Sequence, residues 1–145
     1  MARIPDTLRQ QIIERARGLC EYCQSAKIII ETMEVDHIRP RSERGETTFD
    51  NLALVCRGCN SFKLSFQTGI DPTTGAEVPL FNPRSQEWQE HFQWAGDGAH
   101  VVGMTAIGRA TVERLKMNRE SIIESRLVWV QAGWHPPKSG KFPMD

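Results

Sequence analysis

Long apolar runs are missing from this chain of 145 residues. No stretch approaches the roughly 20 consecutive apolar residues of a membrane-spanning helix, so the sequence predicts no membrane partner. The N-terminal segment also lacks the apolar core of a secretion signal, so we expect a cytoplasmic protein. Hydrophobic residues make up 39% and charged residues 25%, a balance that predicts a globular domain with its own core.

An excess of charge of either sign is also missing. Lysine plus arginine and aspartate plus glutamate each total 18, which gives a net charge of zero with histidine neutral. A simple electrostatic DNA-binding domain is usually basic, so the total charge does not support one. Arg39, Arg41 and Arg44 nevertheless lie close together, either as a focused basic patch or as the solvated face of a loop.

Cysteine is scarce, but its four copies are paired. Cys20 and Cys23 form one C-x-x-C motif, and Cys56 and Cys59 form a second. In a chain without a secretion signal, two such motifs indicate a metal site before they indicate disulfides. Four thiolates on two tight turns suit tetrahedral Zn²⁺, whereas a redox dithiol needs one pair only. A substantial segment must loop out between the two motifs.

The spacing of apolar residues predicts an α+β fold. We expect a helix over 6–17, extended stretches or a hairpin over 27–38, a polar loop over 40–50 and a buried segment over 52–55. A short helix should run from Arg57 to about Phe66, with Phe62 and Phe66 on its inner side. A turn-rich connector over 68–83 should lead to a hairpin around 95–99, helices over 107–117 and 121–131, and a loose tail from Pro136.

One group of polar residues in the first half is suited to metal binding and proton transfer. Asp36 and His37 are adjacent, so on a strand they point to opposite faces, and a bend encouraged by Pro40 would bring both to one site. Asn60 directly follows the last cysteine, so it lies near the start of the expected helix. An anionic oxygen, an amide oxygen and an imidazole together suit a Mg²⁺-type ion and a general base.

The chain carries, in order, C-x-x-C, Val35-Asp36-His37-Ile38-x-Pro40, Asn51-Leu52, and C-x-x-C followed by Asn60-x-x-Lys63. This succession resembles the HNH endonuclease family in its zinc-containing, four-cysteine branch. The resemblance covers residues 20–63, under half of the chain. It implies a ββα-metal (His-Me finger) core, in which strand, loop, strand and helix surround one catalytic ion. Many members carry a Gly-Gly pair in the loop, whereas this loop has Gly45 alone.

The resemblance also implies a role for each matched residue. His37 would deprotonate the attacking water, and Asn51 would orient His37 and brace the loop. Asp36 and Asn60 would bind the catalytic ion, Mg²⁺ or Mn²⁺. Cys20, Cys23, Cys56 and Cys59 would hold a structural Zn²⁺. The candidates for contact with the substrate phosphate are Arg41, Arg39 and Lys63.

The expected function is therefore metal-dependent hydrolysis of DNA phosphodiester bonds, leaving 5′-phosphate and 3′-hydroxyl ends. One such site cuts one strand at a time, so we expect nicking. Residues 1–67 should form the nuclease core with its zinc knuckles, and residues 68–145 a C-terminal extension, a hairpin and two helices, packed on it.

An alternative interpretation is that the chain is a zinc-dependent nucleic-acid-binding module without catalysis. Asp36, His37 and Asn60 argue against it, because a binding module has no use for a base next to metal ligands. The sequence leaves open whether the substrate is DNA or RNA, whether the chain forms a homodimer, and which sequence is cut.

Overall fold

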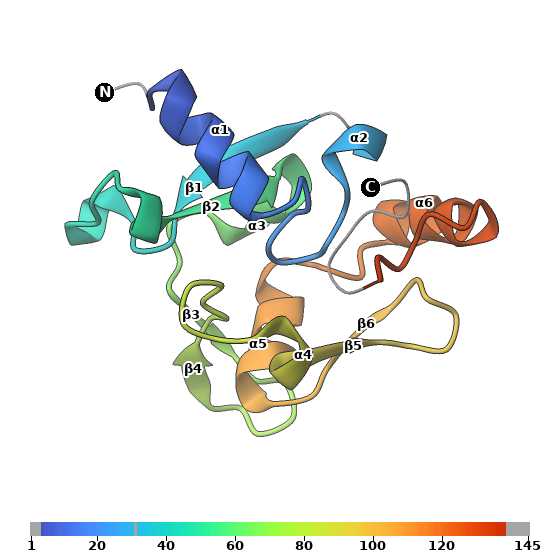
Figure 1. The fold of residues 1–145 in the computed structure, drawn as a ribbon. Coiled ribbons are helices and arrows are strands. Elements are labelled where there is room, and N and C mark those ends of the chain that lie inside the picture. The colour runs from blue at the N-terminus through green and yellow to red at the C-terminus, as the bar shows by residue number, and fades with distance from the viewer. Residues whose placement is uncertain (1–3, 31, 139–145) are drawn as a thin grey trace.

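The computed structural model describes residues 4–30 and 32–138, and Figure 1 shows their arrangement. The first half contains α1 (Asp6–Arg15), α2 (Lys27–Ile30), β1 (Met33–His37), β2 (Leu52–Cys56) and α3 (Arg57–Lys63). The second half contains β3 (Thr68–Ile70), β4 (Glu77–Pro79), α4 (Trp88–His91), β5 (Phe92–Trp94), β6 (Val101–Gly103), α5 (Ala106–Arg114) and α6 (Glu120–Gln131). The fold is thus α+β, and no described helix is long and apolar enough to cross a membrane.

Strands β1 and β2 form an antiparallel pair at the centre of the first half. Their register runs from Met33 opposite Cys56 to His37 opposite Leu52. All five residues of β2 are buried, as expected for a continuous apolar run. Helix α3 follows β2 without a gap, so the chain has the order strand, loop, strand, helix that the sequence predicted.

Helix α1 covers one side of this strand pair (Figure 1). Ile12 is fully buried against Leu52 and Leu54, because the apolar residues of the helix repeat on one face. Arg15, at the end of the helix, donates hydrogen bonds to the carbonyl oxygens of Phe49 and Leu52. Helix α1 therefore holds both β2 and the loop that precedes it.

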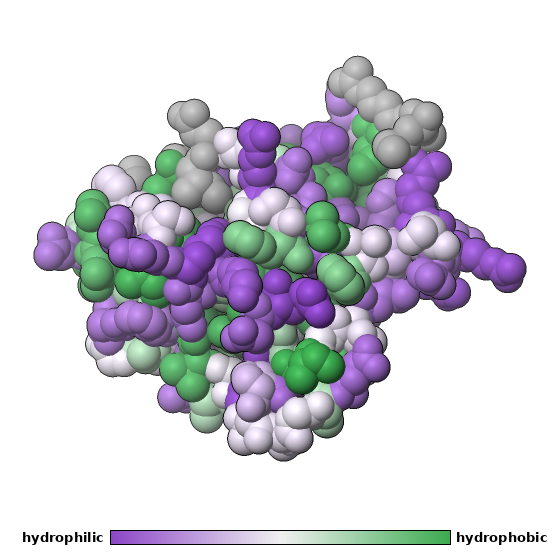
Figure 2. All heavy atoms as spheres, turned by 180° about the vertical axis from the view of Figure 1, so that it is seen from behind, coloured by the Kyte–Doolittle hydropathy of each residue, from purple (hydrophilic) through white to green (hydrophobic). Residues whose placement is uncertain are grey.

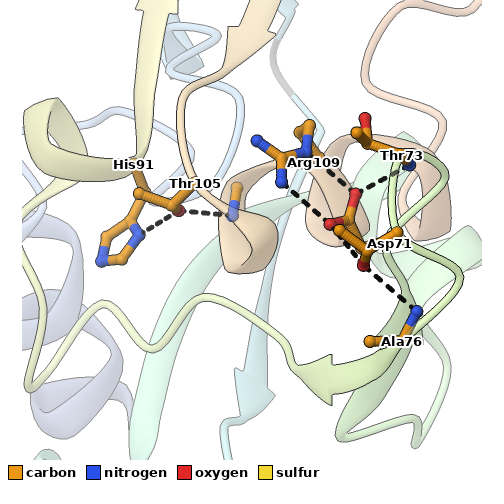
Figure 3. Close-up of polar contacts among 8 residues, drawn as sticks. Asp71, Thr73, Ala76, His91, Thr105 and Arg109 are labelled. Atoms are coloured by element: carbon orange, nitrogen blue, oxygen red, sulfur yellow. Dashed lines mark hydrogen bonds and ion pairs between the residues drawn. The ribbon is translucent and has the colours of Figure 1, made fainter.

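Three two-stranded sheets are described, and two of them lie in the second half of the chain, around α5 (Figure 1). The hairpin β3–β4 is tied to α5 by Asp71, whose carboxylate receives two hydrogen bonds of 2.9 Å from Arg109 (Figure 3). In the same view Thr105 caps α5 by accepting from Gly108 N, and its hydroxyl contacts His91 Nδ1 at 2.7 Å. These polar links hold α5 between its neighbours.

One apolar core joins the two halves of the chain. It contains the four cysteines and Tyr22 from the first half, and Leu80, Phe81, Phe92, Val101, Leu115 and Met117 from the second. The core therefore crosses the expected boundary at residue 67. On the face seen from behind, apolar side chains form small patches separated by polar ones (Figure 2).

The predicted helix at the N-terminus, the hairpin β5–β6 and helices α5 and α6 are confirmed, with ends within a few residues of those expected. The polar segment after Pro40 is a loop, as predicted, with two short 3-10 turns at Arg41–Glu43 and Phe49–Asn51. Of the tail from Pro136, residues 139–145 lie outside the described residues.

Two predictions of local structure were right only in part: the stretch 27–38 is extended in β1 but not before it, and the connector over 68–83 has the predicted turns but also strands. Residues Lys27–Ile30 form a helical turn, because the bridge between Leu19 and Ala26 folds the chain back before it can extend. The connector over 68–83 contains a hairpin, because Asp71 accepts from Thr73 N and from Gly75 N and so closes a tight turn.

The predicted orientation of α3 was wrong. Phe62 and Phe66 are 40% and 42% exposed, and the buried residues of α3 are Cys59 and Lys63. The helix ends at Lys63, because Leu64 adopts a positive φ of 51°. Phe66 therefore lies beyond the helix, and the inner face of α3 is formed by Cys59 and Lys63.

Candidate active site and metal centre

The four cysteines come together in the core. All four are free and buried, and their sulfur atoms lie within 4.8 Å of one another. The Sγ atoms of Cys23 and Cys56 are 3.6 Å apart. Tetrahedral zinc, with Zn–S distances of about 2.3 Å, requires sulfurs nearly 4 Å apart, whereas a disulfide requires about 2 Å. The arrangement can bind a metal ion.

Each C-x-x-C motif forms the same local turn. Cys20 Sγ accepts from Cys23 N at 3.4 Å, and Cys56 Sγ accepts from Cys59 N at 3.4 Å. Hydrogen bonds shared with Cys20, Cys56 and Cys59 hold the pKa of Cys23 well below its ordinary value. The pKa of Cys20, by contrast, is held well above its ordinary value by burial, so metal binding would have to displace protons from the cluster.

The second turn also fixes the start of α3. Cys56 is the N-cap of this helix, and its sulfur accepts the hydrogen bond from the third residue of the helix, Cys59. Asn60 follows at once, and Lys63 lies one turn further along. The cysteine cluster therefore sets the direction of both polar side chains.

Helix α3 presents Asn60 and Lys63 to two acidic residues of β1. Asn60 Nδ2 donates to Glu34 Oε1 at 3.1 Å, and Lys63 Nζ donates to Asp36 Oδ2 at 2.7 Å. Glu34 and Asp36 are two residues apart, so they lie on the same face of the strand. We call Glu34, Asp36, Asn60 and Lys63 the polar row.

His37 follows the polar row at the end of β1. Its Nε2 atom lies 2.8 Å from Thr47 Oγ1. Burial lowers the pKa of His37; Asp36 opposes this effect, and the positive charges of Arg41 and Lys63 add to it. The ring is therefore neutral at pH 7, the form that accepts a proton. The charges of the polar row and of the loop act on this one imidazole.

Asn51 braces the loop between the strands. Its Oδ1 atom accepts from Arg39 N at 2.9 Å, and its Nδ2 atom donates to Arg39 O at 3.0 Å and to Glu46 O at 2.8 Å. These bonds lead to the loop and not to the His37 ring. They hold the segment that contains Thr47, and Thr47 in turn contacts the His37 ring.

Steric crowding requires a glycine at position 45 of the loop. A Cβ atom on Gly45 would lie 1.7 Å from the carbonyl oxygen of Arg39, closer than any side chain permits. The loop therefore closes on itself at this position with one glycine.

The three candidate phosphate contacts lie in different environments. Arg39 and Arg41 are exposed on the loop, and Arg39 Nε donates to Glu43 O at 2.7 Å. Lys63 is buried and paired with Asp36. Arg41 is open to solvent and its charge acts on His37, and the phosphate contacts of all three residues stay predictions.

The sequence analysis did not single out Glu34, Thr47 or Arg15. The i, i+2 alternation along β1 could have indicated Glu34, because it places Glu34 on the face of Asp36. Thr47 and Arg15 act across the loop, and no local pattern marks them.

Comparison with known proteins agrees with this geometry. The model of the HNH endonuclease family matches residues 20–65. The CRISPR-associated endonuclease Cas9 of Corynebacterium diphtheriae is 42% identical over 59 residues, which are 40% of this chain and 5% of that protein. No solved structure matches. The cysteine cluster, the polar row, His37 and the loop all lie inside the matched segment, and residues 20–65 are therefore an HNH endonuclease domain.

Proposed function

We propose that this chain is a divalent-metal-dependent endonuclease that nicks DNA, with His37 as general base. One observation carries the proposal. The imidazole of His37 lies at the end of the strand whose preceding residue, Asp36, joins Asn60 in a row of oxygen donors, all within an HNH domain.

His37 is suited to the proton transfer. Its lowered pKa leaves one ring nitrogen without a proton at neutral pH, and that nitrogen can take the proton of an attacking water. The contact with Thr47 fixes the ring orientation, and Asn51 holds the loop that carries Thr47. We therefore assign Thr47 and Asn51 as positioning residues.

Asp36 and Asn60 fit a hard divalent ion such as Mg²⁺ or Mn²⁺. Lys63 bonds to Oδ2 of Asp36, which leaves Oδ1, and Glu34 bonds to Nδ2 of Asn60, which leaves its Oδ1. Each residue thus has one oxygen without a hydrogen bond to it among the described residues. Such an ion, when bound, neutralises charge on the phosphate and on the leaving oxygen. We assign Arg41, then Arg39, to orient the phosphate from the loop.

Zn²⁺ is the metal we assign to the four cysteines, because four thiolates with tetrahedral spacing are its preferred structural ligands. Its role here would be to fix the start of α3, and with it Asn60 and Lys63. Residues 1–67 would then carry the chemistry, and residues 68–145 would extend the domain.

The test is cleavage of supercoiled plasmid by the purified full chain in Mg²⁺ or Mn²⁺. We expect metal-dependent nicking, products that DNA ligase reseals, and loss of nicking in His37→Ala. His100→Ala is the matched control, because His100 is exposed and pairs with Asp97 in the β5–β6 hairpin. Single-stranded RNA in parallel reactions distinguishes the substrates.

Two outcomes would reject the proposal. If His37→Ala nicks as fast as the wild type, His37 is not the base. If the zinc-loaded wild type cuts neither DNA nor RNA with any divalent metal, the chain fits a zinc-dependent nucleic-acid-binding module instead.

A further inference from the structure

Helix α6 carries an arginine into the core. Arg126 is 0% exposed, and its Nη1 atom donates to Ala99 O at 2.8 Å. Its guanidinium carbon lies 5.2 Å from the centre of the Trp94 ring. The Nε and Nη2 atoms have no hydrogen-bond partner among the described residues. A buried cation with two unpaired donors is costly unless an anion faces it.

Thiolates of the cysteine cluster can supply that anion. Burial lowers the pKa of Arg126, and the charges of Cys23 and Cys59 oppose that effect. The neighbouring Trp94 donates from Nε1 to Gln24 Oε1 at 3.2 Å, and Gln24 directly follows Cys23. Arg126 and Trp94 thus approach the first C-x-x-C turn from the second half of the chain.

A second arginine approaches the other turn. Arg119 is the N-cap of α6, and its Nη2 atom would lie 2.2 Å from a Cβ atom placed on Gly58. Gly58 lies between Cys56 and Cys59, and the absence of its side chain leaves the room that the guanidinium occupies. Burial alone would lower the pKa of Arg119, but the charges of the cysteines, Cys59 first, raise it.

The two arginines match the charge of a metal–thiolate centre. A divalent ion on four thiolates leaves two net negative charges, here in a region without solvent. Arg119 is the N-cap of α6 and Arg126 lies in its second turn, so one helix brings both arginines to the cluster. Their two guanidinium groups supply the opposite charge and N–H donors for the sulfurs.

We propose that Arg119 and Arg126 form a cationic shell around the zinc–thiolate centre, through which the bound metal docks helix α6 onto the HNH domain. The inference rests on the proposal that the cysteines bind zinc, and it assigns a function to a helix outside the matched segment. Groups around a metal's direct ligands commonly change metal affinity by about 10- to 100-fold.

The test measures zinc release from the loaded full chain to a chromophoric chelator. We expect Arg126→Leu and Arg119→Leu to release zinc at least about 10-fold faster than the wild type. Arg126→Lys, which keeps the charge, should fall between Arg126→Leu and the wild type. Arg114→Leu is the matched control, because Arg114 stacks on Phe66 in the same half of the chain, and its release should be unchanged.

Hydrogen exchange on the wild type gives a second readout that needs no variant. We expect removal of zinc to increase exchange in residues 120–131 along with that of the two C-x-x-C turns. This exchange measurement tests the inference even if Arg126→Leu does not fold. Unchanged release in both leucine variants, or unchanged exchange in α6, would overturn the inference while leaving the nuclease proposal intact. A wild type that binds no zinc would overturn the zinc assignment as well.

Discussion

Lys63 Nζ lies 2.7 Å from Oδ2 of Asp36, and only 3% of the lysine side chain is exposed, against 20% of the aspartate. A proposed metal ligand therefore already has a cation beside it. The lysine neutralises the carboxylate from inside the protein, and the exposed part of Asp36 stays open to solvent. This relationship suggests how the metal site is stabilised before the metal binds.

Removal of that cation should make the fold depend on divalent metal. Breaking a buried pair from one side costs about 3–5 kcal/mol, and we expect Lys63→Met to cost up to this amount, since Asp36 is partly exposed. Added Mn²⁺ should restore more stability to the variant than to the wild type, because the ion takes the place of the ammonium. Thermal unfolding with and without Mn²⁺ measures this difference. Lys116→Met, at an exposed pair with Glu113, is the control. Equal Mn²⁺ effects in all three proteins would contradict the argument.

The pH dependence of nicking should report on His37. Because burial holds the pKa of His37 below its ordinary value of about 6.5, the rate should fall only below that pH, as the ring gains a proton. The positive charge of Arg41 contributes to the lowered pKa, so Arg41→Gln should move the acid limb of the profile to higher pH. Arg39→Gln, the control, should change the rate without moving the limb. A limb unmoved by Arg41→Gln would show that another group titrates.

Asn51 should matter to both stability and activity. Its side chain makes three hydrogen bonds to the loop, so Asn51→Ala should lower the free energy of unfolding by about 1–3 kcal/mol. Nicking should fall further than stability explains, because Thr47 is no longer held at His37. Asn118 makes two comparable bonds to Val101, so Asn118→Ala is a control that destabilises without touching the site. Folded Asn51→Ala with full activity would reject the positioning role.

Glu34 should affect the metal requirement and not the base. In Glu34→Ala the Asn60 amide loses the acceptor that fixes its orientation, so we expect about 10-fold more Mn²⁺ for half-maximal nicking. The acid limb assigned to His37 should stay in place. Glu113→Ala, at an exposed position on α5, serves as the control. An unchanged Mn²⁺ requirement would show that Glu34 has no part in the site.

Asp71 should stabilise the second half of the chain in a pH-dependent way. Hydrogen bonds from Arg109 hold the pKa of Asp71 well below its ordinary value, so its stabilisation is present above about pH 4 and is lost as the pH falls further. Asp71→Asn should therefore be less stable than the wild type at pH 7, with a difference that shrinks in acid. Denaturant unfolding at several pH values measures it. A difference that does not change with pH would mean that the charge of Asp71 is not what stabilises the hairpin.

The local patterns of the sequence predicted the cysteine turns of the first half well. Two C-x-x-C motifs are each closed within four residues, so their spacing was enough to predict the turns that gather the sulfurs. The position of Asn60 followed for the same reason, since it directly succeeds the last cysteine. The hairpin β5–β6 and helix α6 could also be predicted, because the periodicity of their apolar residues is local.

Only the tertiary structure decided which side chains meet across long separations. Lys63 pairs with Asp36 across 27 residues, and Cys59 joins the cysteine cluster; these two contacts, and not the apolar character of Phe62 and Phe66, go with the face of α3 that points inward. Arg119 and Arg126 lie far along the chain from the cysteines, and no spacing rule relates them. A sequence fixes which residues are three or four positions apart on a helix, but the packing of whole elements determines which charges share a buried volume.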